Sequence, residues 1–319
     1  MSAVGPNARP TDQGDVTQRD VAFARSAPAY GRWVSWIVVL TLAANGLWLV
    51  ATNPNFEWHV VLQWFTEGSV LKGLQVTLGL TVVSMVLGTL LGLLLAVWRL
   101  SENKLLSGVS ALYIWFFRGT PLLVQLIFWY NLSTLFPTLS ITVPWTDITF
   151  ASWNTNDLIT PLTAAIAGLA LNEAAYMAEI IRAGLLSVDH GQVETTQAFG
   201  MSRSRALRRI IIPQAMRAII PPTGNQLISM IKATSLVSVI AMGDLLYSVQ
   251  AVYNRTFEII PMLMVAVIWY LLITSILNVG QSAIERYYAR GSKRTVVMNK
   301  RRASSDTALA AAPRLKEDV

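Results

Sequence analysis

The chain has 319 residues, of which 53% are hydrophobic and only 13% are charged, and its mean hydropathy is +0.47. Soluble domains usually carry about 25% charged residues, so this composition is typical of a protein with several membrane spans. The chain has no cysteine and two histidines, which excludes disulfides and zinc–thiolate sites and argues against a histidine-based metal centre or a Ser–His triad.

Six segments of the sequence are long and apolar enough to cross a bilayer, which requires about 20 mostly apolar residues. In chain order they are 33–51, 73–98, 119–136, 160 to about 184, about 210 to 231, and 259–284. The first is not expected to be a cleaved signal peptide, because its apolar stretch is long and no convincing small-residue cleavage site follows it. The polar tails, 1–32 and 291–319, are poor in large apolar residues, so we expect them to be disordered.

Positively charged residues predict the orientation of these spans, because loops on the cytoplasmic side carry an excess of Lys and Arg. With the N-terminus inside, the predicted outer loops near 52–69, 137–157 and 244–258 contain Arg255 alone. Both tails are then cytoplasmic. The net charge of +7 follows from this topology, so nucleic acid is not an expected partner.

Local signals refine the predicted spans. Thr120-Pro121 and Thr160-Pro161 each place an N-cap residue before a proline in the first helical turn. The first pair leaves 105–118 as an expected interfacial helix, with Arg118 as an anchor at the inner surface. Gly88 and Gly92 form a G-x-x-x-G pattern, which allows close helix contact.

A polar stretch between two spans, "GQVETTQAFGMSRSRALRRIIIPQA" at 191–215, faces the cytoplasm in this orientation. Asp189 and Gln192 resemble a capping box, which predicts a short helix from about 190 to 199. Gly200 can adopt the left-handed conformation that ends it, and Ser202 or Ser204 can cap the next helix. Such a helix–Gly–helix knob can transmit force to a partner protein, although the residues alone also allow an ordinary loop.

The same stretch resembles the cytoplasmic "EAA" motif of ABC-importer permeases, in which Glu-Ala-Ala is followed at fixed spacing by Gly, Ile and Leu-Pro. Here the pattern reads Glu194-Thr195-Thr196, then Gly200, then Ile210, then Ile212-Pro213. Thr195, Thr196 and Ile212 depart from the commonest residues but keep small or branched apolar character.

The resemblance extends over about 69–290. The stretches "GLQVTLGLTVVSMVLGTLLGLLLAVWRLS", "FRGTPLLVQLIFWY", "NEAAYMAEIIRAGLLSVDHGQ" and "IPQAMRAIIPPTGNQLISMIKATSL" are similar to the polar-amino-acid branch of that family. This resemblance implies an all-α integral membrane protein with the ABC type I importer permease fold. The core of that branch has five spans, so 33–51 is an additional N-terminal helix.

The resemblance also implies partners. Such permeases form dimers, and whether the second protomer is an identical or a sister chain stays open. Each protomer docks one ATP-binding subunit, an extracytoplasmic binding protein delivers the amino acid, and transport follows alternating access. The expected location is the bacterial cytoplasmic membrane, as a multi-pass protein in contact with its lipids. The chain itself is expected to be no enzyme and to bind no metal or cofactor, since ATP and Mg²⁺ belong to the partner subunit.

The residues implied in coupling to the ATP-binding subunit lie in the cytoplasmic segment 185–209. They are Gln192, Glu194, Thr195, Thr196, Ala198, Phe199, Gly200 and Ser202.

Polar residues at mid-membrane depth are candidates for the substrate pathway, because a carboxylate there is costly without a function. Glu173 lies roughly 20 Å along the helix that starts at Thr160. The other candidates are Asn172, Tyr176, Asn225 and Ser229. Each of these five residues could instead have a structural role. The nearby Glu179 and Arg182 can form an ion pair with each other at i, i+3.

Pro213, Pro221 and Pro222 interrupt the backbone hydrogen bonds of the fifth span and are candidate hinge residues. A carboxylate such as Glu173 would favour a cationic amino acid, but it could equally bind the α-ammonium group that every amino acid carries.

The alternatives to an ABC permease are a stand-alone secondary transporter or channel and a membrane enzyme acting on lipids. Neither explains the knob with this spacing, and two histidines give little support to the enzyme.

Overall fold

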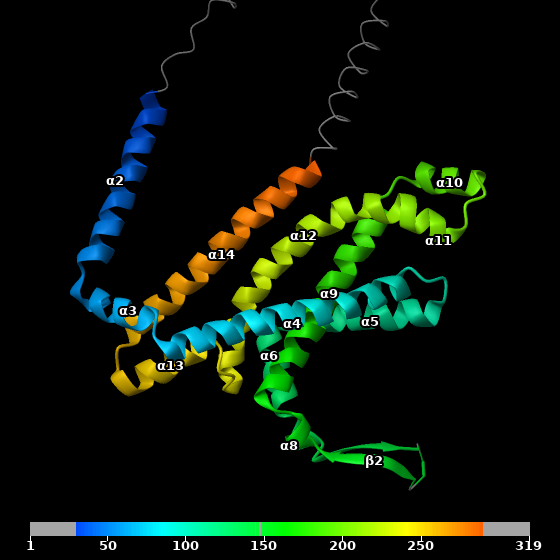
Figure 1. The fold of residues 1–319 in the computed structure, drawn as a ribbon, viewed down its shortest axis with the longest axis horizontal. Coiled ribbons are helices and arrows are strands. Elements are labelled where there is room, and N and C mark those ends of the chain that lie inside the picture. The colour runs from blue at the N-terminus through cyan, green and yellow to red at the C-terminus, as the bar shows by residue number, and fades with distance from the viewer. Residues whose placement is uncertain (1–29, 144, 147, 290–319) are drawn as a thin grey trace, which may run out of the picture. The chain divides into compact units, whose positions relative to one another are not determined.

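The computed structural model describes residues 30–143, 145–146 and 148–289 (Figure 1). It forms two units, one ending at Phe56 and one beginning at Glu57. The predicted tail 1–32 lies outside the described residues except for its last three positions, which already belong to a helix. The predicted tail 291–319 lies outside them altogether.

The first unit consists of helix α2 (Tyr30–Thr52) and a short 3-10 turn, Pro54–Phe56. α2 contains the predicted span 33–51 and has the length and apolar composition of a membrane-crossing helix. None of its side chains is buried within the described unit.

The second unit is mostly helical. Its first half contains α3 (Trp58–Phe65), α4 (Gly68–Arg99), α5 (Lys104–Gly119), α6 (Leu122–Tyr130), α7 (Leu132–Leu135), strands β1 (Thr138–Thr142) and β2 (Thr149–Asn154), and α8 (Thr155–Leu158). Its second half contains α9 (Pro161–Leu186), α10 (His190–Ala198), α11 (Arg203–Ala206), a π-helical turn (Leu207–Ile211), α12 (Ile212–Ala233), a 3-10 turn (Thr234–Ile240), α13 (Leu245–Thr256) and α14 (Ile259–Ala289).

Four helices of the described residues, α2, α4, α9 and α14, are long and apolar enough to cross a membrane singly. The count rises to six if each of two bent helix pairs forms one span. The predicted spans 33–51, 73–98, 160–184 and 259–284 therefore correspond to single helices, and the predicted span 210–231 corresponds to α12, which belongs to one of the bent pairs.

The predicted span 119–136 is wrong as a single helix. α6 has 9 residues and meets α5 at a bend of 102°, so the apolar pair covers 104–130. The bend follows from Pro121, which cannot donate the amide hydrogen bond that the Phe117 carbonyl would receive in a continuous helix. Gln125 Nε2 and Asn172 Nδ2 supply that carbonyl with donors instead, at 3.1 Å and 3.0 Å.

A helix is present at the predicted position 105–118, as α5, and its place at the membrane interface stays a prediction. α5 packs on both α4 and α9, where the Ser110 hydroxyl donates to the Leu95 carbonyl and the Tyr113 hydroxyl to the Leu171 carbonyl, both at 2.8 Å. The predicted cap at Thr120 is also absent, because Pro121 is the N-cap position of α6 and the Thr120 hydroxyl donates back to Phe116.

The second predicted cap is confirmed. Thr160 caps α9, its hydroxyl accepting from the Thr163 amide at 3.2 Å, and Pro161 occupies the first helical turn. At the start of α4, Glu67 accepts from the hydroxyl and the amide of Ser69, and these hydrogen bonds hold the pKa of Glu67 below its usual range.

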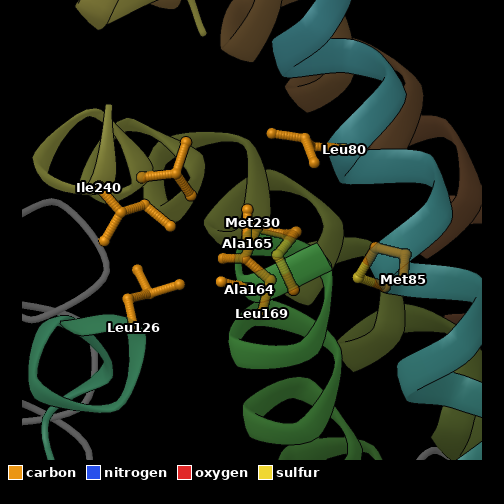
Figure 2. Packing of buried hydrophobic residues seen from close by; sticks show 9 residues of the cluster. Leu80, Met85, Leu126, Ala164, Ala165, Leu169, Met230 and Ile240 are labelled. Atoms are coloured by element: carbon orange, nitrogen blue, oxygen red, sulfur yellow. The ribbon is translucent and has the colours of Figure 1, made fainter. Parts of the chain in front are cut away.

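The core between α4, α6, α9 and α12 is built from aliphatic side chains. Figure 2 shows Leu80 and Met85 of α4 facing Ala164, Ala165 and Leu169 of α9, with Leu126, Met230 and Ile240 closing the cluster. In this cluster Ala164, Ala165 and Leu169 of α9 are fully buried, and the small alanine side chains let the neighbouring helices approach closely.

The G-x-x-x-G pattern marks the contact between α4 and α9, as the sequence predicts. A Cβ atom on Gly88 would lie 2.8 Å from the Cβ of Glu173, and one on Gly92 would lie 2.7 Å from the Cβ of Met177. Both distances are too short for real carbon atoms, so the two glycines permit this approach.

A second core lies near the start of α4. Phe65 of α3 stacks on Trp269 of α14 with ring centroids 4.6 Å apart, and the Trp269 indole N–H donates to the Phe65 carbonyl. Leu245 and Val249 of α13 pack into the same cluster. α3 and α13 thus turn the predicted outer loops 52–69 and 244–258 into packed structure.

The hairpin of β1 and β2 is the one described departure from an all-helical chain, and the sequence analysis did not predict it. It leaves the body next to the N-terminal end of α9, far from α10 (Figure 1).

Candidate functional site

The segment between α9 and α12 forms the predicted helix–Gly–helix knob. Asp189 caps α10, its carboxylate accepting from the Gly191 amide at 2.7 Å. α10 ends at Ala198, and Gly200 lies just past its C-cap Phe199, with a φ of +63° in the left-handed region that glycine tolerates best. The Gly200 amide donates to Gln197 and the Met201 amide to Thr196, a paired C-cap that fixes the turn.

The predicted coupling residues occupy different faces of this knob. Glu194, Phe199 and Gly200 are exposed, and the Phe199 side chain keeps 80% of its surface accessible at the end of α10. Thr196 is 3% exposed, so it packs inside the segment. Gln192, Thr195, Ala198 and Ser202 are exposed, and Ser202 is the N-cap position of α11.

A π-helical turn joins the knob to α12. The Ile212 amide donates to the Leu207 carbonyl across this turn, one residue further back than in an α-helix. Pro213 follows directly, and its ring would clash with the carbonyl four residues before it. The wider turn accommodates that ring, so α11, the π-turn and α12 follow one another as an unbroken, bent helical stretch (Figure 1).

The other two candidate hinge residues, Pro221 and Pro222, lie inside α12, which runs through both of them. Their missing amides leave the carbonyls of Arg217 and Ala218 without intrahelical donors. The carbonyl of Pro221 itself contacts α14, because Gln281 Nε2 of that helix donates to it at 2.7 Å. Gly224 faces the same Gln281, which would overlap any Cβ placed there.

Glu173 lies in the centre of the second unit. Its side chain is 3% exposed, packs against Gly88 of α4, and accepts from Gln226 Nε2 of α12 at 3.2 Å. Its Oε1 atom is buried and has no hydrogen-bond partner among the described residues. The carboxylate therefore joins α4, α9 and α12, and it is closed off from solvent in this arrangement.

The remaining candidates on α9 follow one side of the helix. Asn172 Nδ2 donates to the Phe117 carbonyl and to Gln125 Oε1, so this amide serves the bend between α5 and α6. Tyr176 lies under the guanidinium of Arg118, 5.4 Å from the ring centroid, which is within cation–π range. Glu179 and Arg182 form an ion pair at 2.8 Å, as their spacing predicts.

Arg118, which the sequence predicts as an anchor at the inner surface, is exposed near the end of α5. It lies beside Tyr176, about ten residues or roughly 15 Å before the end of α9. Gln125 and Gln226 were not among the predicted site residues, because their partners Asn172 and Glu173 lie on another helix and the sequence does not show these contacts.

Asn225 and Ser229 are exposed on α12, and the Ser229 hydroxyl donates to the Asn225 carbonyl at 3.1 Å. They share a face of α12, one turn apart, but the hydrogen bond from α12 to the buried carboxylate comes from Gln226. No cluster of three or more His, Cys, Asp or Glu residues that would suit a metal ion occurs in the described part of the chain.

Comparisons with known proteins match this architecture. The family model "binding-protein-dependent transport system inner membrane component" matches residues 88–289. The arginine transport system permease protein ArgU of Corynebacterium glutamicum is 44% identical over 278 residues, covering 86% of each chain. The histidine/lysine/arginine/ornithine transport system permease protein HisM of Salmonella typhimurium is 35% identical over 221 residues, covering 69% of this chain and 90% of HisM.

Among solved structures, a chain of an amino acid ABC transporter crystallised with histidines aligns with a TM-score of 0.59 and 35% identity. The alignment covers 69% of this chain and 94% of that one. A chain of the methionine transporter MetNI aligns with a TM-score of 0.56 at 19% identity, which supports the fold alone. The fold, the motif around Glu194 and Gly200 and these likenesses agree, and the chain belongs to the binding-protein-dependent transport system inner membrane components, as a permease of the amino acid ABC importer type.

Proposed function

We propose that the chain imports a polar amino acid across the bacterial cytoplasmic membrane by alternating access, as one protomer of a permease dimer. A separate ATP-binding subunit supplies the energy, and an extracytoplasmic binding protein delivers the substrate. The observation that carries this proposal is the knob of α10, with its fixed turn at Gly200 and the exposed Phe199 beside that turn. An exposed aromatic side chain on a short rigid helix is a typical anchor in a protein–protein interface.

The knob is connected to the membrane body in a way that suits force transmission. A displacement of α10 passes through Gly200 and α11 into the π-turn and α12, which are continuous in the chain. α12 in turn contacts α9 through Gln226 and Glu173, and α14 through Pro221 and Gln281. Closure of two ATP-binding subunits would therefore move α12 against both neighbouring helices.

Glu173 is the candidate that alternating access would expose. In the described arrangement it is enclosed by α4, α9 and α12, so it meets substrate only when these helices separate. A carboxylate favours a cationic group, and the names of the relatives ArgU and HisM mention arginine, histidine, lysine and ornithine. This supports a cationic amino acid as the substrate.

Arg118 complements this carboxylate. Its guanidinium lies exposed over Tyr176, on the side of α9 that also carries Glu179. Arginine binds carboxylates through paired hydrogen bonds, and every amino acid carries an α-carboxylate. We therefore assign Arg118 to the carboxylate end of the substrate and Glu173 to a cationic group.

Glu173→Gln is expected to raise the KM for uptake of a cationic amino acid roughly tenfold, because a hydrogen bond to a charged group contributes about 1.5–3 kcal/mol. Glutamine keeps the size and the acceptor that Gln226 uses, so folding and assembly should be retained. The measurement is ATP-driven uptake into proteoliposomes, with Glu102→Gln in the exposed turn between α4 and α5 as the matched control.

Unchanged uptake kinetics in Glu173→Gln would remove this residue from the pathway. Arg118→Gln separates the two assignments. Loss of the guanidinium should weaken arginine uptake in the same assay. It should leave unchanged the binding of agmatine, the analogue of arginine that lacks the α-carboxylate, to the solubilised complex. Equal loss for both compounds would contradict a carboxylate contact at Arg118.

A further inference from the structure

The β1–β2 hairpin has two chemically distinct faces. Strand pairing places Leu139 opposite Trp153 and Ile141 opposite Ala151. The alternate pairs are polar: Thr138 with Asn154, Ser140 with Ser152, and Thr142 with Thr149. Because successive strand residues point to opposite faces, one face is apolar and the other carries hydroxyl and amide groups. The hairpin is therefore amphipathic.

The apolar side chains of the hairpin are open in the described structure. Ile141 is 57% exposed, Ile148 is 58% exposed, and Trp145 at the turn is fully exposed. Phe150 at the bulge and Trp153 are also exposed. A soluble surface rarely leaves such a group of large apolar side chains uncovered, so this face requires an occupant.

The residues around the hairpin favour a lipid surface as the occupant of this face. Between residues 137 and 156 the sequence contains one ionisable side chain, Asp147, which lies outside the described residues. At both roots of the hairpin large apolar side chains are exposed, Leu135 and Phe136 on one side and Leu158 and Leu162 on the other, with the polar Asn156 and Asp157 exposed beside Leu158. Exposed apolar side chains thus extend from the hairpin to α7 on one side and to α8 and α9 on the other.

The position of the hairpin along α9 fits a membrane surface. It precedes the start of α9, whereas α10 follows its other end (Figure 1). α9 has 26 residues, so it is roughly 39 Å long and exceeds a hydrocarbon core of about 30 Å. The hairpin and the knob therefore lie at opposite surfaces of the bilayer.

Backbone chemistry limits how deep the hairpin can lie. A two-stranded sheet has an unpaired edge on each side, and unpaired N–H and C=O groups are not tolerated in hydrocarbon. Tryptophan is enriched at the headgroup level, where its apolar ring and its N–H both find partners. The hairpin suits the interface and not the hydrocarbon core.

We propose that the β1–β2 hairpin is an interfacial anchor, whose apolar face lies against the lipid headgroup region at the membrane surface opposite the coupling knob. The hydroxyl face then points to water. This proposal rests on the membrane embedding of the family and is independent of which substrate is carried.

The test uses the absence of cysteine from the chain, which allows single labels without background. Ile141→Cys reports on the apolar face, and the adjacent Ser140→Cys is its matched control on the polar face. Each variant carries a small environment-sensitive fluorophore, and the protein is placed in phospholipid nanodiscs together with its ATP-binding subunit. Ile148→Cys and Thr149→Cys form a second pair in case a variant of the first pair does not fold.

We expect lipids with a nitroxide near the headgroup to quench the label at 141 severalfold more than the label at 140, and aqueous iodide to show the reverse order. Equal quenching at the two positions would overturn the proposal. So would shielding of position 141 that appears only when the binding protein is added, or disulfide formation at 141 between two copies, since these results would assign the face to a protein partner.

Discussion

Phe199→Ala is expected to weaken binding of the ATP-binding subunit by about 30-fold, because an aromatic anchor that fills a pocket contributes about 2 kcal/mol or more. The side chain is 80% exposed at the end of α10, so its removal costs the isolated permease little. ATP-driven uptake should fall in parallel at limiting subunit concentration. The dissociation constant measured by titrating the subunit onto nanodisc-held permease gives the result directly.

Phe257→Ala is the matched control for that variant. Phe257 is an equally open aromatic residue, 83% exposed, but it precedes α14 at the end remote from the knob. It should leave subunit binding unchanged. If both variants bound the subunit as tightly as the unmodified chain, Phe199 would not be an anchor and the docking surface would have to lie elsewhere on the knob.

Gly92→Leu is expected to destabilise the fold by about 3 kcal/mol, the upper end of the usual cost of overpacking. A Cβ atom at this position would lie 2.7 Å from the Cβ of Met177 and 2.9 Å from the carbonyl oxygen of Ala174. The second contact is with backbone, which cannot rotate away, so α4 and α9 have to separate. Thermal unfolding of the purified protein in detergent should show a clearly lower midpoint.

Gly79→Leu is the control within the same helix, because a Cβ atom there has no atom within 4 Å. It should leave the midpoint unchanged, since leucine at this exposed position of α4 meets no neighbouring helix. Equal midpoints for the two variants would mean that the close contact of α4 with α9 does not stabilise the fold.

Local chemistry made the knob predictable from sequence. Asp189 and Gly200 act through bonds to residues within five positions, so the cap and the left-handed turn follow from the order of residues alone. The contact at Gly88 and Gly92 was also predictable, because two glycines one turn apart leave a groove whatever helix fills it. The sequence did not reveal that α9 is that helix.

Features that depend on long-range contacts were not predictable. Hydropathy placed a span at 119–136, but Pro121 breaks the helix, and the donors that stabilise the break come from Gln125 and from the distant Asn172. The contact of Arg118 with Tyr176 was not predictable for the same reason, because it depends on the path of α5 along α9. The hairpin did leave a signal in the alternation of Leu139 and Ile141 with hydroxyl residues, but the segment was treated as a loop.

Among the candidate pathway residues, the structure separates roles that sequence could only group. Glu173, Asn172 and Tyr176 are neighbours on one helix, yet the first joins three helices, the second serves the α5–α6 bend and the third lies under a guanidinium. Helical periodicity gives a residue its face, whereas its role depends on what the facing helix supplies.

The central claim is that motion driven by ATP in another subunit enters this chain through the knob at Glu194–Gly200. Amino acid accumulation by proteoliposomes holding the permease and its binding protein, with and without the ATP-binding subunit, tests it most directly. We predict uptake only when that subunit and ATP are both present. Accumulation by the permease in the absence of any ATPase would contradict the account and favour a secondary transporter.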